Sequence, residues 1–306
     1  MTWWTRPLVR MIAALMLPFV VPAIIIGILW ALPGDPATIL CPPGLCPDLA
    51  RAELAERWHL DEGPGAFYSA WLSSAMSGDF GRSWRVEQGV SVNELLWGAL
   101  PQTAALVGLA IIPLFLASVL AAAGWAHRRL DFLWQGFGLV PAVIGALAFA
   151  AVVNINYGAL SFDGWPGTLR VLLGGLTLGL ADGAFAGAVL GTRAVFEEEH
   201  KRRYVQMATL RGESTLSNTL PNVLPALAGQ FRSRLLHLLS GAVIVEVVLR
   251  IDGLGDLLWA GTLVQDFGVV LAAAFGFALL SGVLMFAQAT AEIGAAVYSR
   301  TSPVKA

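Results

Sequence analysis

Residues 100–125, LPQTAALVGLAIIPLFLASVLAAAGW, contain no charged side chain. A helix needs roughly 20 such residues to cross about 30 Å of hydrocarbon, so this stretch is long enough to span a bilayer. Similar apolar runs occur at residues 8–31, 132–153, 169–194, 232–250 and 268–297. The sequence therefore predicts an all-α membrane protein with about six transmembrane helices.

The composition of the whole chain agrees with a membrane location. Of its 306 residues, 57% are hydrophobic and 13% are charged, and the mean hydropathy is +0.69. A soluble protein cannot bury that much apolar surface. The formal net charge of −2 gives no indication of a nucleic-acid partner, so membrane lipid is the expected surrounding.

The positions of lysine and arginine predict the orientation. If the N-terminus is inside, 13 of the 19 basic residues fall on the inside and six fall in outside segments. Basic residues in short loops are retained on the cytoplasmic side. Both termini are therefore expected in the cytoplasm.

The spacing of the apolar runs predicts three segments. Residues 1–32 form an N-terminal tail and a first helix, residues 33–97 form an outside loop with short helices, and residues 98–306 form a five-helix core. Cys41 and Cys46, the only cysteines, lie in the outside loop. Their spacing allows a small disulfide loop, with two free thiols as the alternative.

A polar loop at residues 197–225 interrupts the core. After the charged block EEEHKRR at 197–203, Tyr204, Met207, Ala208 and Leu210 can share one helical face. Gly212 is a typical helix stop, and the hydroxyl and amide side chains of residues 214–218 suit the start of a second helix. We expect a helix–glycine–helix hairpin that either docks a partner protein or packs on its own bundle.

Two acidic residues fall within the apolar runs. Glu292 lies near the end of the sixth run, where a carboxylate at headgroup level is expected. Asp182 lies near the middle of the fourth run, where an unsatisfied carboxylate would cost several kcal/mol. It is expected either to line a transport pathway or to accept hydrogen bonds inside the bundle.

The sequence lacks the common motifs of enzymes. The only lysines, Lys201 and Lys305, do not follow glycine, so there is no P-loop for ATP. None of the four histidines precedes glutamate, as in zinc hydrolases, and no G-x-S-x-G elbow occurs. We expect no enzymatic activity and no metal or cofactor in this chain, although an intramembrane protease assembled from scattered residues stays an alternative.

Short motifs recur in order along nearly the whole chain. They are LPGDP at 32–36, HLD at 59–61, GDFGRS at 78–83, LPQT at 100–103, LRG at 210–212, LPN at 220–222, GAVIVE at 241–246, DGLGDLL at 252–258 and QDF at 265–267. Together they resemble the permeases of dipeptide, oligopeptide and nickel ABC importers with a long first periplasmic loop. The resemblance implies a type I ABC importer fold in a bacterial inner membrane.

The resemblance also implies a role and partners. The chain would form half of the pathway for a peptide-like or similar small solute, next to a second homologous permease subunit. Two cytoplasmic ATPase subunits would hold ATP and Mg²⁺, and a periplasmic or lipid-anchored binding protein would deliver the solute. This chain has Leu210-Arg211-Gly212 where the family usually has Ala-Lys-Gly, so its partner interface is expected to be altered.

Residue roles follow from the same resemblance. The implied ATPase-coupling residues are Tyr204, Ala208, Leu210, Arg211, Gly212, Glu213, Leu220 and Pro221. The implied pathway candidates are Asp182, Gly241 and Glu246. The implied gate or binding-protein contacts are Asp35, Gly78, Asp79, Gly81, Ser83, Gly253 and Gly255.

Two other functions stay open on the sequence alone. In an ion-coupled secondary transporter, Asp182 and Glu246 would be the coupling carboxylates. A degenerate subunit would instead scaffold a transport complex without moving solute.

Overall fold

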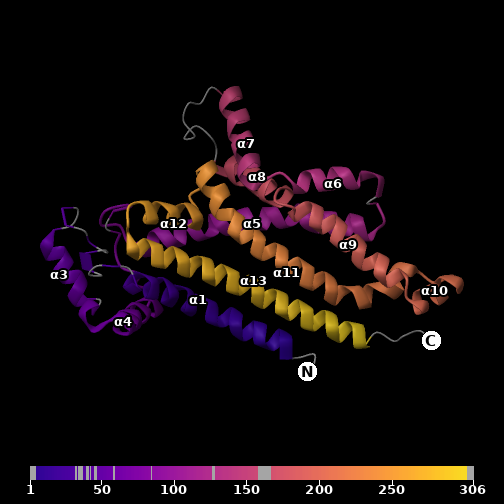
Figure 1. Cartoon of the computed structure of the whole chain (residues 1–306), viewed down its shortest axis with the longest axis horizontal. Coiled ribbons are helices and arrows are strands. Elements are labelled where there is room, and N and C mark those ends of the chain that lie inside the picture. The colour runs from indigo at the N-terminus through magenta and orange to yellow at the C-terminus, as the bar shows by residue number, and fades with distance from the viewer. Residues whose placement is uncertain are drawn as a thin grey trace. The chain divides into compact units, whose positions relative to one another are not determined.

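The computed structural model describes residues 5–31, 33, 37–38, 41, 43–44, 47–57, 59–83, 85–125, 128–157 and 167–301. Within these ranges the regular elements are helices, with one isolated bridge between Arg82 and Ser91. The helices are α1 (Thr5–Ala31), α3 (Asp48–Arg57), η1 (Leu60–Glu62), α4 (Pro64–Met76), α5 (Val92–Ala122), η2 (Arg128–Leu130), α6 (Asp131–Gly138), α7 (Ala142–Tyr157), α8 (Gly167–Leu180), α9 (Ala184–His200), α10 (Arg203–Leu210), α11 (Thr215–Leu249), α12 (Leu254–Leu263) and α13 (Phe267–Thr301) (Figure 1).

The chain divides into two compact units that share three long helices. The first unit contains residues 1–15, 104–251 and 283–306, and the second contains residues 16–103 and 252–282. Helices α1, α5 and α13 each contribute one part to each unit.

Three helices are long and apolar enough to cross a membrane. They are α1, α5 and α13, and they confirm the expectation for the first, second and sixth apolar runs. The α8–α9 pair passes the same test only when it is counted as one span, bent by 43°. The number of six crossings stays a prediction, because the helices that contain the third, fourth and fifth apolar runs begin and end at other residues than these runs do.

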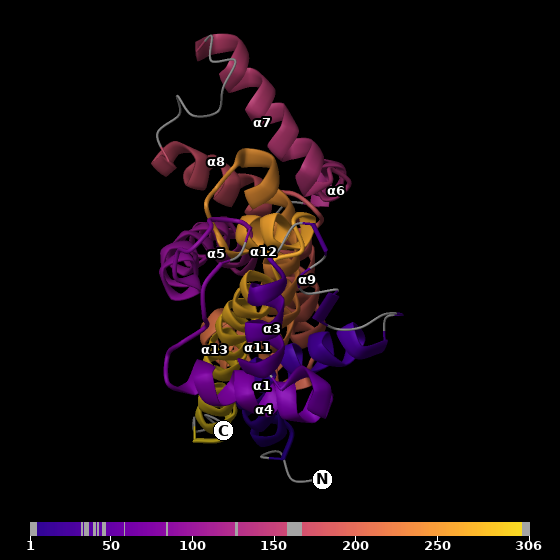
Figure 2. The same cartoon turned by 90° about the vertical axis from the view of Figure 1, so that its left-hand side faces the viewer.

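The third apolar run is not one helix, as expected, but two. Helix α6 ends at Gly138 and α7 begins at Ala142, and the two run in clearly different directions (Figures 1 and 2). Pro141 causes the break, because proline has no N–H to donate and restricts the residue before it. The carbonyl of Pro141 then accepts from the N–H groups of Ile144 and Gly145, which starts α7.

Ion pairs attach α6 to α9. Arg193 on α9 donates to both carboxylate oxygens of Asp131 at 2.6 and 2.7 Å. Arg128, just before α6, donates to Glu197 at 2.7 Å. Parallel N–H donation from one guanidinium to one carboxylate fixes orientation as well as distance, so α6 is held against α9.

The fourth apolar run is also broken, at Ala181–Gly183. Asp182 and Gly183 both have positive φ, 52° and 73°, which a continuous right-handed helix does not allow. Gly183 tolerates this conformation because it lacks a Cβ. The break therefore follows from local backbone geometry that a hydropathy profile does not detect.

The fifth apolar run predicts a helix over residues 232–250. Instead α11 is continuous from Thr215 to Leu249 and includes Pro221 and Pro225. Both prolines lie in the first three turns, in the part predicted to leave the membrane, where water can satisfy the carbonyls that they leave without donors. The second helix of the predicted hairpin and the fifth span are thus one helix.

Close packing of α8 against α5 holds the first unit together. A Cβ at Gly175 would lie 2.6 Å from the Cβ of Leu109, and one at Gly179 would lie 2.7 Å from the carbonyl oxygen of Ala110. Small residues spaced four apart let membrane helices approach this closely. The glycines of α8 therefore set its distance from α5.

The ends of α1 and α13 meet through Glu292. Its carboxylate accepts from Arg10 of α1 and from Gln288 of α13, and Gln288 also donates to the carbonyl of Ala228 on α11 at 3.2 Å. These polar contacts satisfy a carboxylate that hydropathy alone places near a span end.

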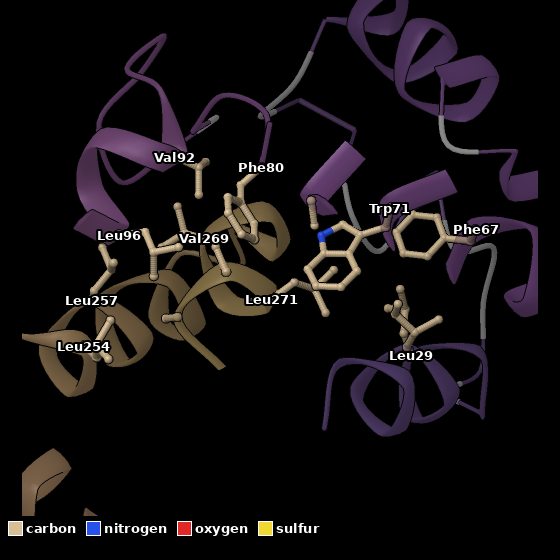
Figure 3. Packing of buried hydrophobic residues seen from close by; sticks show 14 of the residues in the cluster. Leu29, Phe67, Trp71, Phe80, Val92, Leu96, Leu254, Leu257, Val269 and Leu271 are labelled. Carbon is tan, nitrogen blue, oxygen red and sulfur yellow. The ribbon is translucent and has the colours of Figure 1, made fainter. Parts of the chain in front are cut away.

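The core of the second unit is apolar and aromatic. Trp71 lies between α1 and α13, near Phe67, Leu29 and Leu271 (Figure 3). It meets Phe80 edge-on at 6.2 Å between ring centroids. Further buried members are Leu60, Val92, Leu96, Leu254, Leu257 and Val269. Burial of this cluster holds α4 and the following loop against the outer parts of α1, α5 and α13.

Candidate functional site

The polar loop forms the predicted hairpin, made of α10, a turn at residues 211–214 and the start of α11 (residues 203–222). Gly212 has φ +78°, in the left-handed region, and nothing lies within 4 Å of the Cβ that an alanine would add there. Ser214 precedes α11, and its hydroxyl accepts from the N–H of Ser217 at 3.4 Å. The helix–glycine–helix prediction is therefore confirmed as a local structure.

Polar side chains brace the turn. Glu213 accepts from Arg211 at 2.8 Å and from Asn218 at 3.2 Å, so one carboxylate joins both sides of Gly212. Each bond is partly exposed, so its individual contribution to stability is small. Together the two bonds restrict the angle between α10 and α11.

Tyr204 fastens the hairpin to the end of α9. Its hydroxyl donates to Glu199 of α9 and accepts from Asn222 of α11 at 2.7 Å. Burial, followed by the hydrogen bond to Glu199, raises the pKa of Tyr204 to about 12. The phenol therefore stays neutral and able to donate over the physiological pH range.

The hairpin presents apolar side chains on its surface. Leu210 is 81% exposed and Met207 is 53% exposed, and Leu216 at the start of α11 is also exposed. Ala208 was expected on the same face but is buried, as is Val205, because these two residues pack α10 onto its own unit. Leu220 and Pro221 lie within α11 and are only partly exposed. A contact surface would therefore consist of Met207, Leu210, Leu216 and the exposed Arg211.

Asp182 acts inside the bundle. Its carboxylate accepts from the N–H of Ala142 at 3.0 Å, and its own N–H donates to the carbonyl of Val140 at 2.9 Å. Asp182 thus accepts a hydrogen bond inside the bundle, and a role in a transport pathway stays a prediction.

Gly241 and Glu246 were expected along the transport pathway, but both are buried. A Cβ at Gly241 would lie 2.7 Å from the side chain of Leu178, so this glycine lets α8 approach α11. Glu246 has no exposed surface. Both residues therefore lie on the packed side of α11, and their place along a transport pathway stays a prediction.

The predicted outer contacts divide into exposed and buried residues. Gly78 and Asp79 are exposed, and Asp79 accepts from the N–H of Gly81 at 2.8 Å. Ser83 is only 2% exposed. Gly81, Gly253 and Gly255 are buried. Among the described members of this group, Gly78 and Asp79 are the ones that another protein could touch.

Two of the predicted site residues are not among the residues that the structure describes. Asp35 and Cys46 are outside the described residues, while Cys41 is buried. Cys41 is disulfide-bonded, and the identity of its partner as Cys46 stays a prediction because Cys46 lies outside the described residues.

Asp266 joins two segments of the second unit that are far apart in sequence. Its carboxylate accepts from the hydroxyl of Ser83 at 2.7 Å and from the N–H groups of Arg85 and Val86 at 3.0 and 3.3 Å. It also accepts from the N–H of Val269 in the first turn of α13, at 3.4 Å. We call these contacts the Asp266 anchor.

Sequence reasoning gave Asp266 no role. The local signals were its place in the QDF motif and an acidic residue directly before an apolar run, a pattern that is typical of a helix cap. That pattern does not reveal that the second carboxylate oxygen holds a loop some 180 residues earlier in the chain.

Comparison with known proteins identifies the family. The family model described as "Binding-protein-dependent transport system inner membrane component" matches residues 114–292, which is more than half of the chain. The oligopeptide transport system permease protein OppB of Haemophilus influenzae is 25% identical over 252 residues, covering 78% of this chain and 80% of the relative. The glutathione transport system permease protein GsiC of Escherichia coli K12 is 27% identical over 276 residues, covering 85% and 87%. The chain therefore belongs to the family of binding-protein-dependent transport system inner membrane components.

Proposed function

We propose that the chain is a permease subunit of an ATP-driven importer and couples to a separate ATPase through the α10–α11 hairpin. The hairpin's exposed leucine and methionine are the observation that carries this proposal. Large apolar side chains at the tip of a polar loop gain little by facing water, and they are common at sites where proteins dock.

The continuity of α11 supports a mechanical role for the hairpin. A push on residues 211–216 acts on a helix that runs without a break to Leu249, about 50 Å along its axis. The contacts of Tyr204 with Glu199 and Asn222 make α9 move with it. ATP needs only to bind one conformation of the complex more tightly than the other to shift their populations.

The proposed complex contains two permease subunits, two ATPase subunits and a solute-binding protein. ATP and Mg²⁺ belong to the ATPase subunits, and both termini of this chain face the cytoplasm. A peptide-like solute is proposed because the relatives' names refer to oligopeptide and glutathione transport. The exposed Gly78 and Asp79 are the proposed contacts for the binding protein.

Uptake into proteoliposomes or cells that contain the whole complex tests the proposal. Vanadate should stop uptake, and a protonophore should leave it intact while ATP is present. Loss of uptake with the proton gradient at constant ATP would contradict the proposal and favour an ion-coupled transporter.

A further inference from the structure

One face of α11 is exposed and polar within residues 232–250, the predicted fifth span. From residue 233 to residue 249 the exposed side chains are Ser233, Leu236, His237, Ser240 and Ile244. Ser233 and Ser240 lie about 24 and 14 Å from Leu249 along the helix axis, which is within the hydrocarbon thickness of a bilayer. We call Ser233, His237 and Ser240 the polar stripe.

The helices α1 and α5 provide the contrast. From residue 8 to residue 31, every exposed position of α1 is Gly, Ala, Val, Leu, Ile or Met. From residue 104 to residue 122, every exposed position of α5 is also apolar. Such faces suit lipid. The polar stripe of α11 therefore has a different neighbour.

The polar stripe has hydrogen-bonding groups that need partners. Within the described part of the chain, neither the hydroxyl of Ser233 nor the imidazole of His237 has a hydrogen-bond partner, while Ser240 donates to the carbonyl of His237 at 2.8 Å. A hydroxyl or imidazole left without a partner in hydrocarbon costs several kcal/mol. Lipid alone therefore does not suit this face, and water or a polar ligand would satisfy these groups.

Contacts on the adjacent face of α11 fix its rotation. Arg234 donates to the carbonyl of Gly187 on α9, and Gln230 donates to the carbonyl of Gly191 at 3.4 Å. A Cβ at Gly191 would lie 2.7 Å from the side-chain oxygen of Gln230 and 2.8 Å from the guanidinium of Arg234, so an alanine at this position would require these side chains to shift. These contacts keep the polar stripe pointing away from α9.

The charge near the polar stripe is basic. Arg234 is half-buried and takes part in no ion pair within the described residues, and its contact with Gly187 uses only some of its five N–H donors. His237 lies one turn further along α11. No exposed acidic residue lies between residues 232 and 249 of this helix. A guanidinium in these surroundings favours a carboxylate ligand.

We propose that the polar stripe lines the water-filled solute path and that, with Arg234, it forms a subsite for the carboxylate of the solute. This inference rests on the proposed importer function and adds a solute class to it. Peptides with a free C-terminus carry such a carboxylate, whereas cationic solutes and metal aquo ions do not.

Thiol labelling of the assembled transporter tests the proposal. Ser233→Cys and Ser240→Cys change one atom each, Val119→Cys on the apolar face of α5 is the matched control, and the unchanged chain is the blank. Membrane-impermeant methanethiosulfonates react with thiolates in water. We expect labelling at 233 and 240 to be at least about tenfold faster than at 119.

The charge of the reagent tests the carboxylate subsite. The measured quantity is the labelling rate with the anionic sulfonate reagent divided by the rate with the cationic trimethylammonium reagent. We expect this ratio to be higher for Ser233→Cys than for a free thiol in solution. Adding Arg234→Gln should reduce the preference for the anionic reagent by about threefold. The amide of the new glutamine can still donate to the carbonyl of Gly187. A preference at or below that of the free thiol would overturn the subsite, even if Arg234→Gln fails to assemble.

The outcomes separate the two proposals. If uptake is ATP-dependent but positions 233 and 240 label no faster than position 119, the polar stripe does not line the path and the importer function stands. Cross-linking of these cysteines to the second permease without labelling would likewise overturn the inference, because a protein interface would then cover the stripe. If the complex shows no ATP-dependent uptake, the proposed function fails and this inference fails with it.

Discussion

The carboxylate of Asp182, between α8 and α9, accepts a hydrogen bond from the backbone N–H of Ala142, the first residue of α7, at 3.0 Å. In return, the N–H of Asp182 donates to the carbonyl of Val140 at 2.9 Å. The first bond satisfies the N–H group of Ala142 at the start of α7, and the second satisfies the carbonyl of Val140 in the break before it. Two breaks 40 residues apart therefore support each other, and neither would be stable in hydrocarbon alone.

Replacement of Asp182 should affect stability and not ion coupling. Asp182→Ala removes an acceptor at a helix start and should lower the stability of the purified protein by about 0.5–2 kcal/mol. Asp182→Asn keeps a side-chain oxygen and should recover most of that loss. Thermal unfolding of the two variants in detergent checks this. A stable Asp182→Asn protein that no longer transports would instead show that the charge itself is needed.

Replacement of Gly212 should uncouple the transporter. A Cβ at φ +78° costs about 1–2 kcal/mol, which shifts the hairpin conformation by about five- to thirtyfold. Gly212→Ala should reduce solute-stimulated ATP hydrolysis accordingly, and Gly212→Pro should reduce it further because proline cannot adopt positive φ. The amount of protein in the membrane should not change.

Gly229→Ala is the matched control for Gly212. Gly229 lies within α11, its φ is not positive, and nothing lies within 4 Å of an added Cβ. We expect wild-type ATP hydrolysis from this variant. Equal activity of the 212 and 229 alanine variants would contradict the role of the turn.

Loss of the Asp266 anchor should loosen the loop before α5. Asp266→Ala would leave the hydroxyl of Ser83 and the N–H groups of Arg85 and Val86 without this acceptor, at a cost of about 3 kcal/mol. Amide hydrogen exchange in residues 81–91 should become faster. Ser83→Ala removes one donor and should cost only about 1 kcal/mol. Unchanged exchange in Asp266→Ala would rule out the anchor.

The raised pKa of Tyr204 predicts a stability change at high pH. Because the folded-state pKa of about 12 exceeds the ordinary value of 10.0, the neutral phenol contributes stability that is fully present below pH 10. This stability is lost as the pH rises from 10 through 12. The melting temperature of the wild type should therefore fall more over this interval than that of Tyr204→Phe, which cannot ionise. Parallel curves for the two proteins would contradict the raised pKa.

Local signals in the sequence were sufficient for some elements. The long apolar runs of α1, α5 and α13 predict spans because length and hydropathy are properties of each segment alone. The hairpin could be predicted because a glycine stop and a serine cap act within a few residues.

Features that depend on distant partners could not be predicted. The break at Asp182 is stabilised by Val140 and Ala142, and hydropathy does not indicate which backbone groups meet. Ser83 looked like an exposed contact residue because its burial depends on Asp266, 183 positions later. The exposed face of α11 could not be identified because the buried and exposed sides both contain polar residues, such as Glu246 and His237.

The docking of the hairpin on an ATPase is the central claim, and photo-crosslinking from position 210 tests it most directly. A benzoylphenylalanine in place of Leu210 should form a cross-link to the ATPase subunit in the assembled transporter. The same amino acid in place of Leu263, another exposed leucine, on α12, should form none. A cross-link from 263 and none from 210 would contradict the claim.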